Sequence, residues 1–203
     1  MEIRLKDTSV FYLRLEEVSR VLTLCREAGI AVEDLMELPV KRQREKAAER
    51  LLLCRAFGHP VKLSYTEQGA PYVEDHDFNV SISHTSRLVV LACNTASVIG
   101  IDAEQADRPQ VLRVRDKFLN ASEQQFIAPD DLAAHVIAWT SKEAIIKAER
   151  NSAIDWTNGI CLEPFTPNTK ETLIAARCRN CRYSLVSRLI EGHYITLAKP
   201  EIG

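Results

Sequence analysis

Two stretches near the N-terminus carry apolar side chains at helical spacing. The first predicts a helix from Leu15 to Ala28, ended by Gly29, with an apolar face of Val18, Val21, Leu22 and Cys25. The second predicts a helix from Lys41 to Phe57, ended by Gly58, with a stripe of Ala47, Ala48, Leu51, Leu52 and Cys54. The chain is therefore expected to open with helices.

The period then changes from helical to twofold, which is typical of β-strands. Apolar and polar residues alternate over residues 61–65 and again over 80–83. Leu88 to Cys93 is apolar throughout, as expected for a strand buried on both faces. A further strand is predicted from Val98 to Glu104.

The second half of the chain repeats this order. Asn120 and Glu123 have the spacing of a capping box, and Asp130 or Asp131 is placed to cap a longer helix that reaches Glu149. Strands are predicted over residues 172–177, 183–188 and 193–198. Residues 78–92 and 182–198 share one strand–turn–strand plan, which indicates an internal repeat. We therefore predict an α+β fold of two similar halves, residues 1–96 and 97–203, with a cleft between them.

Composition narrows the class of protein. The chain has 203 residues, of which 46% are hydrophobic and 27% charged, and its net charge is −2, so its overall field does not favour nucleic acid. Charges interrupt residues 1–6 and exclude a signal-peptide core, and no apolar run is long enough for a membrane helix. A cytoplasmic protein is expected. Cys178 and Cys181 lack the second ligand pair of a zinc site, and we interpret them as two thiols near a strand turn.

Residues 99–104 carry the most informative chemistry. Side chains alternate along a strand, so Asp102 and Glu104 point to one side while Ile99, Ile101 and Ala103 point to the core. Two adjacent carboxylates repel each other, and a hard cation with oxygen ligands would relieve that repulsion. The alternative is a strand that runs out into a polar loop with both acids solvated.

A second candidate segment spans residues 139–147. On a helix, Trp139, Glu143 and Lys147 share one face. A surface ion pair would explain the two charges, but the tryptophan should turn this face inward. A buried pair needs partners, which a metal for Glu143 and a phosphate for Lys147 would supply.

A third candidate is the strand end at Ser83 and His84, where both side chains are suited to hydrogen-bond a phosphate. A turn with polar residues is the alternative. A nucleophile–base pair is not predicted, because the chain has no G-x-S-x-G motif.

Together these segments resemble the 4′-phosphopantetheinyl transferase superfamily, and in particular its surfactin-synthetase-activator (Sfp-like) type with two pseudo-symmetric halves in one chain. The resemblance covers residues 40–150. Its G-(I/V)-D-x-E motif matches residues 100–104, and its W-x-x-K-E-(A/S)-x-x-K motif matches residues 139–147. Its F-N-x-S-H-type strand is similar to residues 78–84, its basic helix to residues 50–53, and its Phe and Glu at a helix start to Phe118 and Glu123.

The resemblance implies transfer of the phosphopantetheine arm of coenzyme A to a serine of an apo acyl or peptidyl carrier protein, with release of 3′,5′-ADP. It implies Mg²⁺ held by Asp102, Glu104 and Glu143. It further implies phosphate contacts from Lys147, Lys142 and His84, a weaker one from Ser83, and Arg50 near the nucleotide. The proton of the serine would pass to a metal-bound water or to one of Glu104, Glu123 and Glu143. A chain that completes its own site is expected to be a monomer.

Two positions depart from the family pattern. Ala70 stands where a G-(K/R)-P turn usually has a basic residue, and Arg150 stands where a glycine is common. A degenerate member that binds coenzyme A or a carrier without transfer is therefore an alternative, and a generic metal-dependent phosphohydrolase is another. A basic run of Arg108, Arg113, Arg115 and Lys117 suits an acidic carrier protein, although a solvated helix face explains it equally well.

Overall fold

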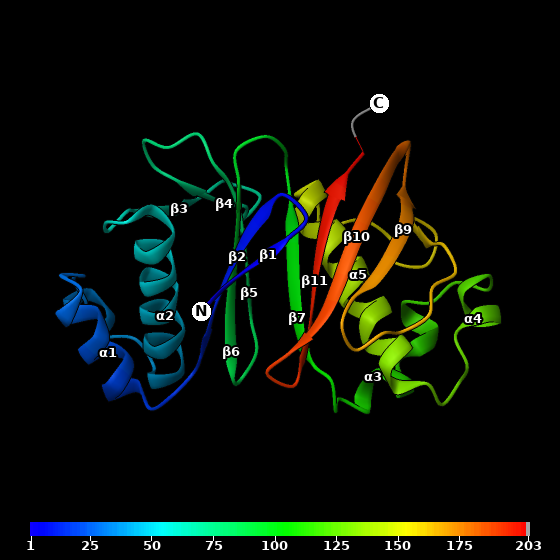
Figure 1. Cartoon of the computed structure of the whole chain (residues 1–203), viewed down its shortest axis with the longest axis horizontal. Coiled ribbons are helices and arrows are strands. Elements are labelled where there is room, and N and C mark those ends of the chain that lie inside the picture. Colours follow the sequence, from blue (N-terminus) through cyan, green and yellow to red (C-terminus); the bar gives the residue numbers. More distant parts are fainter. Residues whose placement is uncertain (202–203) are drawn as a thin grey trace.

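The computed structural model describes residues 1–201 and arranges them as two antiparallel β-sheets with helices on their outer faces (Figure 1). The first sheet contains, in spatial order, β1 (Glu2–Leu5), β2 (Thr8–Arg14), β6 (Leu88–Asn94), β5 (Asn79–His84), β4 (Pro71–Val73) and β3 (Leu63–Tyr65). The second contains β7 (Gly100–Gln105), β11 (His193–Pro200), β10 (Cys181–Ile190), β9 (Thr172–Cys178) and β8 (Ile160–Leu162).

Two long helices cover the sheets. Helix α2 (Val40–Phe57) packs with α1 (Val18–Glu27) against the first sheet, and α5 (Leu132–Glu149) packs against β7 and β11 of the second. The shorter helical turns are η1 (Glu33–Leu35), α3 (Gln110–Arg113), η2 (Arg115–Lys117) and α4 (Glu123–Phe126). Within residues 1–201, no helix combines the length and the apolar character required to cross a membrane.

The two halves have matching topology. Without β1, the first sheet reads β2-β6-β5-β4-β3 and the second reads β7-β11-β10-β9-β8. In each half one of these strands precedes the long helix and four follow it, and α2 and α5 both have 18 residues. The predicted α+β fold with pseudo-symmetric halves is confirmed. The chain changes sheets between Asn94 and Gly100, an interval that includes the predicted division at residues 96 and 97, while the independence of the halves as domains stays a prediction.

Several local predictions are confirmed in detail. The N–H of Asn120 donates to Glu123 Oε2 at 2.8 Å and the N–H of Glu123 to Asn120 Oδ1 at 2.9 Å, which is the reciprocal pattern of a capping box. Asp131, rather than Asp130, caps α5 by accepting from the N–H of Ala134 at 2.9 Å. Helix α1, however, begins at Val18 instead of Leu15.

The N-terminal hairpin corrects the predicted order of elements. The chain opens with β1 and β2, not with a helix, and β2 pairs with β6. The alternation of apolar and charged side chains in residues 2–5 is that of an edge strand. Val10 and Tyr12 of β2 are buried against the second sheet, so the hairpin belongs to the core of the molecule.

Strand β6 lies at the centre because both of its faces are buried. Val89 and Leu91 face the helices α1 and α2, whereas Leu88 and Val90 face a core between the two sheets that includes Ile101. This arrangement confirms the doubly buried strand expected from its continuous apolar run. It also fixes β7 next to β5, where the candidate site is found.

Candidate active site

Strand β7 and helix α5 meet at Gly100, which positions the acidic side chains. A Cβ atom built at this glycine would lie 1.8 Å from the backbone oxygen of Ala144. Only a residue without a side chain therefore lets α5 approach β7 this closely. The contact brings Glu143, the neighbour of Ala144, to the side of β7 on which Asp102 and Glu104 lie.

Strands β5 and β7 and helix α5 enclose a cavity of about 390 Å³, which we call the acidic cavity. Six of the predicted site residues line it, namely Ser83, His84, Asp102, Glu104, Glu143 and Lys147. Trp139 also lines it, so the predicted common face of Trp139, Glu143 and Lys147 is confirmed. The prediction that Asp102 and Glu104 point to one side of their strand is confirmed as well.

Strand β5 supports the cavity through two serines that connect the sheets. Ser81 Oγ accepts from the N–H of Ile101 at 3.0 Å, and Ser83 Oγ accepts from the N–H of Ala103 at 3.3 Å. Ser83 in turn donates to Asp102 Oδ1 at 2.6 Å. In this structure the Ser83 hydroxyl therefore orients Asp102.

The carboxylates differ in their partners. Lys147 Nζ donates to Asp102 Oδ1 at 2.8 Å and to the carbonyl oxygen of Ile101 at 3.0 Å. Glu104 pairs with Arg108, whose guanidinium carbon lies 5.4 Å from the ring centre of Trp139. Arg108, considered from sequence as part of a carrier-binding run, thus belongs to the cavity itself.

Glu143 is the carboxylate without a partner. Among residues 1–201 it forms neither a hydrogen bond nor an ion pair, and it lines the cavity together with the carboxylate of Asp102. Burial, and then the charge of Asp102, raise the pKa of Glu143, while Lys147 acts in the opposite direction. Within the described part of the chain, Glu143 is therefore the position in the cavity at which no cationic side chain or hydrogen-bond donor neutralises the carboxylate.

This donor set suits a hard divalent cation. Oxygen ligands are what Mg²⁺ prefers, and Mg²⁺ commonly takes few protein carboxylates because it keeps several waters. Glu143 is unpartnered, and no hydrogen bond within the described residues reaches Asp102 Oδ2. Within residues 1–201, however, no group of three or more His, Cys, Asp or Glu side chains is arranged so that it could hold a metal ion, so the three carboxylates line one cavity without converging on a point.

His84 has a partner that the sequence did not indicate. Its Nε2 lies 2.5 Å from Oε1 of Glu49, a buried residue of α2, which also accepts from Lys46 at 2.8 Å. Burial alone would raise the pKa of Glu49, but the hydrogen bonds from His84 and Lys46 outweigh it and hold that pKa below its ordinary value. Glu49 thereby fixes the histidine at the edge of the cavity.

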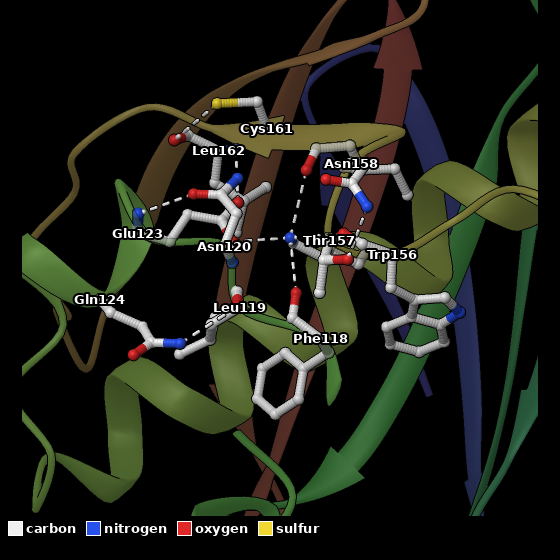
Figure 2. A network of polar contacts seen from close by, with 12 residues as sticks. Phe118, Leu119, Asn120, Glu123, Gln124, Trp156, Thr157, Asn158, Cys161 and Leu162 are labelled. Atoms are coloured by element: carbon white, nitrogen blue, oxygen red, sulfur yellow. Dashed lines mark hydrogen bonds and ion pairs between the residues drawn. The ribbon is translucent and has the colours of Figure 1, made fainter. Parts of the chain in front are cut away.

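Glu123 lies in a separate buried network (Figure 2), and its ion pair brings Lys142 into the same network. Lys142 Nζ is fully buried and donates to Glu123 Oε2 at 2.7 Å and to the carbonyl oxygens of Phe118, Trp156 and Ile160 at 2.6, 2.8 and 3.2 Å. Every donor of this ammonium has an acceptor, so the predicted phosphate contact of Lys142 is wrong.

Glu123 is equally committed to this network. Besides the ion pair, its carboxylate accepts from the N–H groups of Asn120 and Leu162, each at 2.8 Å, and the residue has no exposed surface. It does not line the acidic cavity. The prediction of Glu123 as a possible base is therefore also wrong.

Arg50 lies apart from the acidic cavity. Its guanidinium donates to Asp34 and to the carbonyl oxygen of Ala31. It lines a cavity of about 760 Å³ beside α2 that shares no lining residue with the acidic cavity. The aspartate partner and this location do not support the nucleotide contact expected from the basic helix, and that contact stays a prediction.

A second pocket of about 220 Å³ adjoins the acidic cavity, and we call it the Arg150 pocket. Ile82, His84 and Lys147 line both spaces. Ala70 and Arg150, the two departures from the family pattern, line this one pocket together. The positions that looked unrelated in sequence are therefore neighbours in space.

Comparison with known proteins agrees with this geometry. A search of curated proteins gives no match to the chain. The sequence model of the family described as the 4′-phosphopantetheinyl transferase superfamily matches residues 98–198, which contain β7, α5 and the three carboxylates of the acidic cavity. The chain belongs to the 4′-phosphopantetheinyl transferase superfamily.

Proposed function

We propose that this protein transfers the 4′-phosphopantetheine group of coenzyme A to a serine of an apo acyl or peptidyl carrier protein, in an Mg²⁺-dependent reaction that releases 3′,5′-ADP. The observation that carries the proposal is the acidic cavity, in which three carboxylates face one space beside Lys147 and His84. Membership of the superfamily supports phosphopantetheinyl transfer in general. The two-half topology supports the Sfp-like type.

Asp102, Glu104 and Glu143 would hold the Mg²⁺. The ion, when bound, would supply positive charge that stabilises the pyrophosphate of coenzyme A while it is cleaved. Lys147 would exchange its contact with Asp102 for an oxygen of the leaving phosphate. His84, held by Glu49, would donate to a second phosphate oxygen.

The reaction forms a bond between the serine oxygen and the phosphorus next to pantetheine, and breaks the bond from that phosphorus to the bridging oxygen. The electron pair leaves with 3′,5′-ADP. Of the glutamates considered as base, Glu104 and Glu143 line the cavity. Glu143 is the better acceptor for the serine proton, because Glu104 is engaged by Arg108, whereas no side chain of the described residues donates to Glu143 and an oxygen that does not bind the ion would be free to take the proton.

One chain supplies every element of the site, so we propose that the protein is a monomer. We also propose that it works in the cytoplasm. Strand β5 comes from the first half, and β7 and α5 come from the second. Arg108 is engaged by Glu104, which leaves Arg113, Arg115 and Lys117 as the cationic surface proposed for an acidic carrier.

Mass spectrometry of a carrier protein tests the proposal directly. Apo carriers from fatty-acid, polyketide and peptide synthesis are incubated with coenzyme A and Mg²⁺, and at least one should gain the mass of a single phosphopantetheine group. EDTA should prevent the gain. Asp102→Asn should reduce the rate by roughly 100-fold or more, as loss of a strong electrostatic contact does in other enzymes. An unchanged mass with every carrier would refute the transferase assignment.

One observation favours a non-catalytic alternative. Asp102 and Glu104 already have cationic partners in Lys147 and Arg108, so two of the three acids are neutralised by the chain itself. A protein that binds coenzyme A or a carrier without transfer would not need a metal ion to neutralise these two acids. Calorimetric binding of coenzyme A together with an absent mass gain would support that alternative.

A further inference from the structure

The Arg150 pocket differs in charge from the acidic cavity that it adjoins. Its side chains with formal charge are Lys147 and Arg150, joined by the titratable His84, and no carboxylate lines it. Neutral hydrogen-bonding groups, including Ser81 and Asn151, complete its polar lining. The chain thus places a purely basic pocket next to an acidic one.

Arg150 occupies its position at a conformational cost. It is the C-cap of α5, with φ 53° and ψ 34° in the left-handed region, where glycine is the favoured residue. An arginine here carries backbone strain that glycine would avoid, and such strain is commonly found at ligand sites. Its side chain is therefore worth testing for a binding role.

The guanidinium of Arg150 is available to an anion. It is exposed and donates to the neutral amide oxygen of Asn79 at 3.2 Å. Across residues 1–201 it forms no ion pair, whereas Arg50 and Arg108, the other arginines near cavities, are paired with Asp34 and Glu104. An unpaired guanidinium with a planar set of donors is well suited to phosphate.

We propose that Arg150 is a specificity-determining residue that binds the ribose phosphate of coenzyme A and so selects this donor over dephospho-coenzyme A. The inference rests on the proposed transfer reaction. Coenzyme A carries a pyrophosphate and a separate phosphate on its ribose. With the pyrophosphate at Lys147, the adenosine end, which carries the further phosphate, would extend into the adjoining basic pocket, where Arg150 lies about one helical turn beyond that lysine.

The test compares the two donors in the full-length protein. The wild type should have a higher kcat/KM for coenzyme A than for dephospho-coenzyme A, and Arg150→Met should lower this ratio by about 10- to 100-fold, the value of a charge-assisted hydrogen bond. Arg4→Met is the matched control, because Arg4 is exposed on the edge strand β1 and belongs to neither cavity. It should keep the wild-type ratio.

Two further variants separate charge from backbone effects. Arg150→Gly relieves the left-handed strain and should unfold at the same or a higher temperature, yet lose the donor preference like Arg150→Met. Ala70→Lys in the Arg150→Met background supplies a cation from another position that lines the same pocket and should restore part of the preference. Adenosine 3′,5′-bisphosphate, followed by calorimetry, should bind more weakly to Arg150→Met than to Arg4→Met.

The outcomes distinguish this inference from the proposed function. A wild type that modifies a carrier with both donors at equal kcat/KM overturns the inference and leaves the transferase assignment intact. An unchanged ratio in Arg150→Met does the same. If Arg150→Met raises the KM for the carrier protein and affects both donors equally, the pocket serves the acceptor and the inference is also overturned. Absence of any transfer refutes the proposed function, and calorimetry then judges the phosphate site by itself.

Discussion

Replacement of Lys142 by methionine should lower the free energy of unfolding by about 4 kcal/mol without removing a contact to coenzyme A. The ammonium of Lys142 is fully buried and bonds Glu123 and three carbonyl oxygens. Methionine fills a similar volume but donates nothing, so the carboxylate of Glu123 would stay in the interior without its counter-ion. Removing one partner of a buried ion pair typically costs about 3–5 kcal/mol.

This loss converts into a measurable shift. For a chain of 203 residues the entropy of unfolding is about 0.4 kcal/mol/K, so Tm should fall by about 9 °C. In urea, with a slope of about 2 kcal/mol/M, the midpoint should fall by about 2 M. Lys170→Met is the control, because Lys170 is exposed and its effect should stay within about 0.5 kcal/mol. The KM of folded Lys142→Met for coenzyme A should change little.

The reasoning fails if Lys142→Met keeps its stability and instead binds coenzyme A more weakly. A variant with the wild-type urea midpoint and a tenfold higher KM for coenzyme A would mean that Lys142 reaches phosphate in solution. The double variant Glu123→Leu, Lys142→Met gives a further check. Because it removes both buried charges, its loss of stability should be smaller than the sum of the two single losses.

Three other perturbations follow from the site. Glu143→Gln should abolish most transfer but raise stability at neutral pH. The pKa of Glu143 in the folded protein lies above the ordinary 4.5, so the wild type loses stability as the pH rises above 4.5. Urea unfolding of the variant at several pH values should not show that loss. Glu49→Gln should lower stability at neutral pH. The pKa of Glu49 in the folded protein lies below 4.5, so this carboxylate stabilises the wild type above pH 4.5, and the difference between wild type and variant should disappear as the pH falls below that value. Gly100→Ala should cost at least about 1–3 kcal/mol, measured by urea unfolding, and impair transfer, because the added methyl group meets the Ala144 oxygen and displaces α5.

Local patterns were sufficient for the elements that form the site. The apolar stripe of residues 41–57 and the acid-capped run ending at Glu149 predict α2 and α5 to within one or two residues. Strand alternation is enough to put Asp102 and Glu104 on one side of β7. These predictions succeed because each depends on the geometry of a single element.

Contacts between distant segments were beyond such patterns. Glu49 meets His84 across 35 residues of sequence, and the arginine next to Glu49 attracted the prediction instead. The N-terminal hairpin was missed because four alternating residues are too short to predict a strand. Residues 2–5 form a strand because they pair with β2. Ala70 and Arg150 are 80 residues apart in number, and only the fold brings them to one pocket.

Lys142 shows how a motif can conceal a division of labour. Lys142 and Glu143 are adjacent in sequence, and the resemblance implied a phosphate contact for Lys142 and a metal contact for Glu143 within one site. Helical spacing separates them: Lys142 lies with His135, Ala138 and Ile145 on a face that is fully buried, whereas Glu143 lies with Trp139 and Lys147. That spacing was readable in the sequence and would have placed the lysine in the interior.

Helix α5 therefore combines opposing contributions to stability. On one face, Lys142 joins the segments around Phe118, Trp156 and Ile160 through a satisfied ion pair. On the other face, Glu143 faces Asp102 without a partner, and the helix ends at the strained Arg150. Repulsion and strain at a site persist only where the surrounding structure holds the backbone in place. The buried network, together with the close contact at Gly100, prevents α5 from moving away from β7 to relieve the charge, and so keeps the carboxylates of the acidic cavity where the proposed divalent cation would stabilise them.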